Sequence, residues 1–129
     1  MNILDIATHN SFIKKLYPTG LSCFSVRSLA LSQDRVTLVL HEETAPAIQV
    51  EKWGVWGKDY SIITFEFIGL PLHKATIDNW QNNREDVEFI STILVQDDLL
   101  HIQFKGVDWE VEVVLSSLVF QRNSTYLKG

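Results

Sequence analysis

The chain has 129 residues, of which 46% are apolar and 21% charged, and this composition predicts one folded domain over residues 1–129 rather than a disordered segment. Its formal charge of -5, from 11 basic and 16 acidic residues, argues against binding to nucleic acid or anionic lipid, because phosphate recognition requires clustered lysine and arginine. No apolar run approaches the roughly 20 residues of a membrane helix, and the first residues lack a secretion-signal pattern. We therefore expect a cytoplasmic protein that binds no membrane.

One short helix is predicted near the N-terminus, over residues 11–17. Asn10 or Ser11 can cap its first turn with a side-chain oxygen, and Pro18 and Gly20 end it. Its apolar side is formed by Phe12, Ile13 and Leu16. No second helix is predicted.

Alternating apolar and polar residues dominate the chain from about residue 29 to residue 115, which is typical of strands with one buried and one solvated face. The first two strand segments, residues 23–31 and 35–40, are separated by a short turn and are predicted to pair as a hairpin. Residues 42–60 lack this periodicity and are predicted to form an extended connection.

Five further strand segments are predicted, over residues 61–67, 73–80, 87–95, 99–104 and 109–115. Residues 69–71 are expected to turn the chain between the first two of these, and a polar loop is expected over residues 81–86. Short turns between consecutive strands make them antiparallel neighbours. The sequence therefore predicts a mainly β fold with one short N-terminal helix, an antiparallel meander of six or seven strands that forms a bent sheet or a sandwich.

The apolar phase of these strands predicts the core. Phe65, Phe67, Phe104 and Trp109 are expected to be buried, and Cys23 is expected to be a small buried residue. The full set of inward strand positions is Ile63, Phe65, Phe67, Phe89, Ile102, Phe104, Val111 and Val113. These side chains are bulky enough to fill the interior by themselves.

The sequence contains no arrangement typical of a catalytic or metal site. His41-Glu42-Glu43 begins like a zinc-protease helix, but Ala45 stands where the second histidine would be required. The four histidines lie in different segments, and Glu110 and Glu112, although on one face, are more typical of a solvated sheet than of a carboxylate pair. We therefore expect no catalytic residues, no metal, no cofactor and no enzymatic activity.

Four short segments of the chain share a pattern with a known family. They are Lys52-Trp53, the strand over residues 61–67, the strand over residues 75–80 that ends in Trp80, and Ser124-Thr125-Tyr126. In this pattern, over roughly residues 12–126, the chain resembles the immunity protein 50 family of bacterial polymorphic toxin and contact-dependent inhibition systems. The resemblance implies a small β-rich protein, encoded beside a toxin, that binds the toxin domain and neutralises it.

The acidic side of the strands is the predicted contact surface for such a partner. Glu66, Asp78, Glu110 and Glu112 each fall on the polar side of a strand, and Trp80 is in phase with Asp78. An acidic face with an aromatic anchor suits the basic cleft of a toxin that attacks nucleic acid. We therefore predict that these five residues contact a cognate toxin domain and occlude its active site.

The sequence leaves two other classes open: a small ligand-binding or hydrolytic β-barrel, and a β-rich adaptor domain. A barrel would require a lined cavity, which the bulky inward side chains disfavour, whereas an adaptor would differ only in its partner. Trp53 and Trp56, in the long connection, are assigned neither to the core nor to an interface.

Overall fold

The computed structural model describes residues 1–85 and 87–128, so the last residue of the predicted loop over residues 81–86 lies outside the described residues. Most of the described chain belongs to one sheet. In chain order the elements are α1 (Ile3–Ile6), β1 (Ala7–Thr8), α2 (Ser11–Leu16), β2 (Phe24–Leu31), β3 (Val36–Glu42), η1 (Glu51–Trp53), β4 (Ile62–Asp78), η2 (Trp80–Asn82), β5 (Ile90–Gln96), β6 (Leu99–Lys105) and β7 (Glu110–Tyr126).

The strand order is β2-β3-β4-β7-β6-β5, and every neighbouring pair in it is antiparallel. The short strand β1 pairs in parallel with β7, beyond the stretch of β7 that pairs with β6. The chain thus builds two three-stranded meanders, β2–β3–β4 and β5–β6–β7, which join along β4 and β7. The mainly β, antiparallel fold is confirmed, and within the described residues the sheet stays open, with β2 and β5 as its edges.

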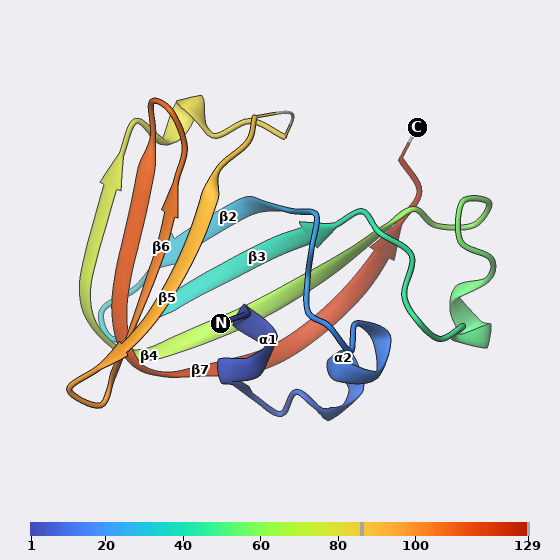
Figure 1. Ribbon diagram of the computed structural model, residues 1–129, viewed down its shortest axis with the longest axis horizontal. Coiled ribbons are helices and arrows are strands. Elements are labelled where there is room, and N and C mark those ends of the chain that lie inside the picture. The colour runs from blue at the N-terminus through green and yellow to red at the C-terminus, as the bar shows by residue number, and fades with distance from the viewer. Residues whose placement is uncertain (86, 129) are drawn as a thin grey trace.

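The two central strands are long and bent. β4 and β7 have 17 residues each and pair along almost their whole length. Both change direction near their middle, as Figure 1 shows, so the sheet folds over onto itself. We call β2, β3 and the adjoining residues 62–69 and 118–126 the first half-sheet, and β5, β6 and the adjoining residues 72–78 and 110–115 the second half-sheet.

The predicted turn at residues 69–71 is wrong, because β4 continues through it. The chain bends there at a cis Leu70–Pro71 peptide and a register shift between Leu72 and Lys74, while pairing with β7 is kept on both sides. Gly69 does not form a turn, but it leaves room for a side chain of the neighbouring strand. A Cβ atom at this position would collide with the side chain of Leu115 on the neighbouring strand.

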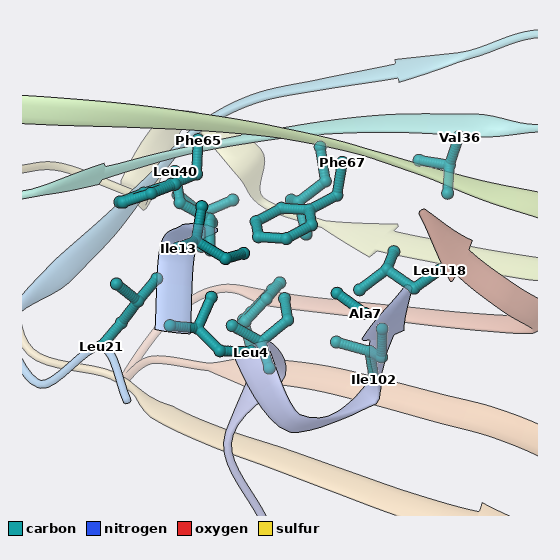
Figure 2. Packing of buried hydrophobic residues seen from close by; sticks show 14 of the residues in the cluster. Leu4, Ala7, Ile13, Leu21, Val36, Leu40, Phe65, Phe67, Ile102 and Leu118 are labelled. Carbon is teal, nitrogen blue, oxygen red and sulfur yellow. The ribbon is translucent and has the colours of Figure 1, made fainter. Parts of the chain in front are cut away.

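The predicted core is confirmed. Phe65, Phe67 and Phe104 are fully buried and Trp109 is 3% exposed, while Phe89 packs against them half-buried. Figure 2 shows the N-terminal segment inside the bend of the sheet, where its apolar side chains face those of β4. The interior is therefore filled by side chains from both half-sheets and from the first 20 residues of the chain.

The sequence predicted α2 but missed α1. The side-chain oxygen of Asn2 accepts a hydrogen bond from the Leu4 N–H (3.1 Å), and the Asp5 carboxylate accepts one from the Asn2 N–H (3.2 Å). This reciprocal capping box is the signal in the sequence that could have revealed the helix. On α2, Ile13 and Leu16 are buried as predicted, whereas Phe12 is 40% exposed and packs edge-on against Trp53.

The prediction that Cys23 is buried is wrong, since the structure exposes it. Cys23 precedes β2, where the backbone and not the side chain is held in place. The carboxylate of Glu42 accepts hydrogen bonds from the Ser22 and Cys23 N–H groups (2.9 and 3.1 Å) and from the Thr44 hydroxyl (3.0 Å). Glu42 is fully buried on the core face of β3, so these bonds replace its lost hydration.

Candidate partner-binding surface

Three of the predicted contact residues lie together on the outer face of the second half-sheet. Asp78 of β4 is directly opposite Glu110 of β7, and Glu112 follows two residues along the same strand, opposite Thr76. Directly opposite residues of an antiparallel pair share a face, as do residues two apart in a strand. The strand pairing of β4 with β7 therefore brings Asp78, Glu110 and Glu112 into one group.

Basic and polar neighbours partly neutralise the negative charge of this group. The Lys74 ammonium lies 3.4 Å from the Glu112 carboxylate, and the Gln103 side-chain amide donates to Glu110 at 2.7 Å. Lys105 stands opposite Glu110 on β6. With three carboxylates and two lysines on it, this face is less acidic than the alternation of β7 alone indicated.

The acidic character is strongest at the end of this face, at the β6–β7 turn. Asp78, Asp108 and Glu110 line a shallow hollow of about 280 Å³ there, together with Lys105. The side chain of Asn82 in η2 donates to the Asp108 carbonyl (3.1 Å), so the turn is tied to the end of β4. Asp108, which precedes Glu110 by two residues, thus joins the predicted residues, although the sequence analysis did not include it.

Glu66 lies apart from the other predicted contact residues. It precedes Asp78 by 12 residues on β4 and belongs to the first half-sheet, beyond the bend. Its carboxylate is 20% exposed and forms an ion pair with Arg122 (3.0 Å) in a hollow that is also lined by His41, Thr64, Ser124 and Tyr126. Glu66 is therefore not part of the acidic group around Glu110.

Side chains from neighbouring strands contact one another around the polar hollow that contains Glu66. The hydroxyl groups of Thr64 and Ser124 are hydrogen-bonded, and the ring of His41 stacks on Tyr126 with 6.0 Å between ring centroids. Burial lowers the pKa of His41, and the nearby positive charge of Arg27 lowers it further. His41 is thus held in its neutral form in the first half-sheet.

Trp80 does not stand beside the carboxylates as an exposed anchor. Asn79 has a left-handed backbone conformation (φ 51°) that ends the strand, so Trp80 begins η2. Its ring is half-buried and meets Trp109 edge-on, with 6.3 Å between ring centroids. Trp53 and Trp56 are also half-buried, and both pack edge-on against Tyr60.

One serine and one histidine approach the geometry of a nucleophile and its base. The His73 Nε2 atom lies 2.9 Å from the Ser116 hydroxyl, across β4 and β7 near the bend. The pair is exposed, and within the described residues no carboxylate is hydrogen-bonded to the His73 ring, so the third group that orients such a base is missing. In the described part of the chain, no group of three or more His, Cys, Asp or Glu side chains could hold a metal ion.

The structure exposes one surface that the sequence did not single out. Strand β5 forms an edge of the sheet, and Ile90, Leu94 and Val95 are all more than half exposed on it. A signal for this exists in the sequence, because residues 90–96 carry apolar side chains at both odd and even positions without any charge. A strand with one solvated face would instead alternate.

Comparisons of the chain with protein-family models, with curated proteins and with solved structures found no match. Across residues 1–85 and 87–128, no helix has the length and apolar composition needed to span a membrane.

Proposed function

We propose that the protein is an immunity protein, which binds a cognate bacterial toxin domain with a basic active-site cleft and neutralises it by covering that cleft. The observation that carries this proposal is the group of carboxylates Asp78, Asp108, Glu110 and Glu112, gathered on one face and one end of the second half-sheet. The resemblance to the immunity protein 50 family supports it independently. In this proposal the protein acts in the cytoplasm of the cell that makes it.

The rigidity of the sheet favours such a role. Asp78 and Glu110 project from directly opposite positions of two long paired strands, so their backbone needs no ordering when a partner arrives. The lysines that adjoin them, Lys74 and Lys105, reduce nonspecific attraction, since a partner must match both signs of charge. The contact surface that we propose omits Glu66, which lies beyond the bend, and Trp80, whose ring is half-buried against Trp109.

Charge reversal of this surface tests the proposal. The variant Glu110→Lys/Glu112→Lys should associate about tenfold or more slowly with the toxin domain encoded beside its gene at low salt, because long-range attraction becomes repulsion. The difference should shrink at high ionic strength, where the charges are screened. Stopped-flow association kinetics at both salt concentrations and a growth-protection assay with the co-expressed toxin measure these effects.

The matched control is Asp34→Lys/Glu51→Lys, which changes the net charge equally but lies in the β2–β3 turn and in η1. It should alter association far less than the patch variant. If the folded patch variant associates and protects like the wild-type protein, the carboxylate group is not the contact surface.

A hydrolytic function is the second candidate, because the His73 ring and the Ser116 hydroxyl are within hydrogen-bond distance. In that case the pure protein would hydrolyse an activated ester, and Ser116→Ala would abolish the turnover, because the hydroxyl would be the attacking group. Activity that is equal in the wild-type protein and in Ser116→Ala would exclude this pair as the catalytic site.

A further inference from the structure

Strand β5 is an edge without the usual protection. Residues 90–96 read Ile-Ser-Thr-Ile-Leu-Val-Gln and include no charged residue, proline or glycine. Ile90 is 71% exposed, Leu94 53% and Val95 51%, and the strand pairs regularly with β6, without a bulge. Edge strands of soluble proteins are normally blunted by charges, prolines or bulges, because an exposed edge pairs readily with other chains.

The opposite edge of the same sheet shows this protection. Strand β2 carries Arg27 within a register shift between Val26 and Ser28. The side-chain amide of Asn83 also donates to the Val26 carbonyl (2.8 Å), which covers part of the strand. The two edges thus belong to one sheet, and only β5 is left with a regular, uncharged backbone ladder.

The turn after β5 determines which of its backbone groups point outward. Asp97 and Asp98 have positive φ angles (54° and 60°) and form a two-residue hairpin loop between Gln96 and Leu99. The pair that closes such a loop is hydrogen-bonded, and hydrogen-bonded pairs alternate along an antiparallel ladder. The N–H and C=O groups of Ser91, Ile93 and Val95 therefore point away from β6.

The ends of β5 are acidic, although its middle is uncharged. At the C-terminal end stand Asp97 and Asp98. At the N-terminal end, Glu88 lines a cleft of about 500 Å³ that continues to Ser91, and Glu85 on the same cleft is ion-paired with Lys128 (3.1 Å). A segment that lies along β5 would thus meet apolar side chains in its centre and negative charge at both ends.

We infer that β5 is a docking strand for an extended segment of a basic protein partner, which adds to the sheet as a further strand. The segment's backbone bonds to Ser91, Ile93 and Val95, its alternate apolar side chains cover Ile90 and Leu94, and a lysine or arginine at each end meets the acidic ends of β5. This inference concerns the mode of binding and stands without the proposed immunity function.

A second copy of the chain is the wrong occupant on charge grounds. Full antiparallel overlap of two β5 strands centres on Ile93, and it places Glu88 of one chain opposite Asp98 of the other at both ends of the pair. Like charges directly opposite each other destabilise a strand pair, and each chain also has a formal charge of -5. A segment with basic ends removes this repulsion.

Two nine-residue peptides test the inference with the full chain. The first has the sequence Lys-Thr-Val-Thr-Val-Thr-Val-Thr-Lys with blocked ends, and the second has glutamate in place of both lysines. Added at ten times its dissociation constant, the first peptide should slow hydrogen exchange of the Ser91, Ile93 and Val95 amides about tenfold, as measured by NMR, because bound amides are closed to solvent. The second peptide should bind at least tenfold more weakly.

A proline variant distinguishes backbone pairing along β5 from nonspecific hydrophobic association. Val95→Pro removes an N–H group that points outward and keeps the hydrogen bonds with β6, so the chain should fold and bind the basic peptide at least tenfold more weakly. The matched control is Leu31→Pro on the β2 edge, where the bond from the Ser32 N–H to the Arg35 carbonyl places the Leu31 N–H outward by the same alternation. This control should leave peptide binding unchanged.

Several results would overturn the inference. They are an unchanged exchange rate at Ser91, Ile93 and Val95 with the basic peptide, equal binding of the two peptides, and equal effects of the two proline variants. Dimerisation of the free chain through β5 in analytical ultracentrifugation would show that the occupant is a second copy.

Discussion

The two half-sheets differ in how completely their inner faces are covered. In the first half-sheet, α1, β1 and α2 pack into the bend, and Leu4, Ile13, Phe65 and Phe67 are at most 2% exposed. In the second half-sheet, burial is concentrated along β6 and β7, and β5 is exposed on both faces except at Ile93. Both half-sheets contribute buried side chains to the core, but the inner face of the first is covered by the N-terminal elements, whereas β5 at the edge of the second leaves surface open to a partner.

The largest effect is expected in the first half-sheet. Phe65→Ala should lower the free energy of unfolding by about 3–5 kcal/mol, since it removes a fully buried aromatic ring between Tyr17 and Phe120. Chemical denaturation followed by circular dichroism measures this loss. A variant with the wild-type midpoint would show that stability is not concentrated around the bend.

An intermediate effect is expected at the buried carboxylate. Glu42→Ala should cost about 1–3 kcal/mol, because the N–H groups of Ser22 and Cys23 lose their acceptor. The neighbouring variant Glu43→Ala removes only a partly exposed ion pair with Lys128 and should cost about 1 kcal/mol or less. Equal losses for the two variants would contradict the structural role of Glu42.

The smallest effect on stability is expected at the edge of the second half-sheet. Leu94→Ala should change the free energy of unfolding by about 0.5 kcal/mol or less, because the side chain is 53% exposed. The same variant should bind the basic nine-residue peptide more weakly than the wild-type protein does, as measured by NMR titration. A stability loss similar to that of Phe65→Ala would show that β5 is as tightly packed as the first half-sheet, which would remove the contrast between the two halves.

Much of the fold was predictable from local patterns. Two-residue alternation located most of the strands, and the phase of that alternation identified Phe65, Phe67 and Phe104 as core residues. The turn signal at residues 69–71 misled the prediction, because glycine and proline also occur where a long strand bends or bulges. The burial of Glu42 was equally hidden, since only the folded chain brings the Ser22 and Cys23 N–H groups to its carboxylate.

Local sequence patterns specify the class of the fold, its core and the side of each strand that carries charge, because these depend on side chains a few residues apart. Which charged residues share a surface depends instead on how the strands pair and bend. The pairing of β4 with β7 joins Asp78 to Glu110, the bend separates both from Glu66, and the turn at Asn79 withdraws Trp80 into contact with Trp109. Such proximity depends on the order of strands in the sheet, and local periodicity does not specify that order.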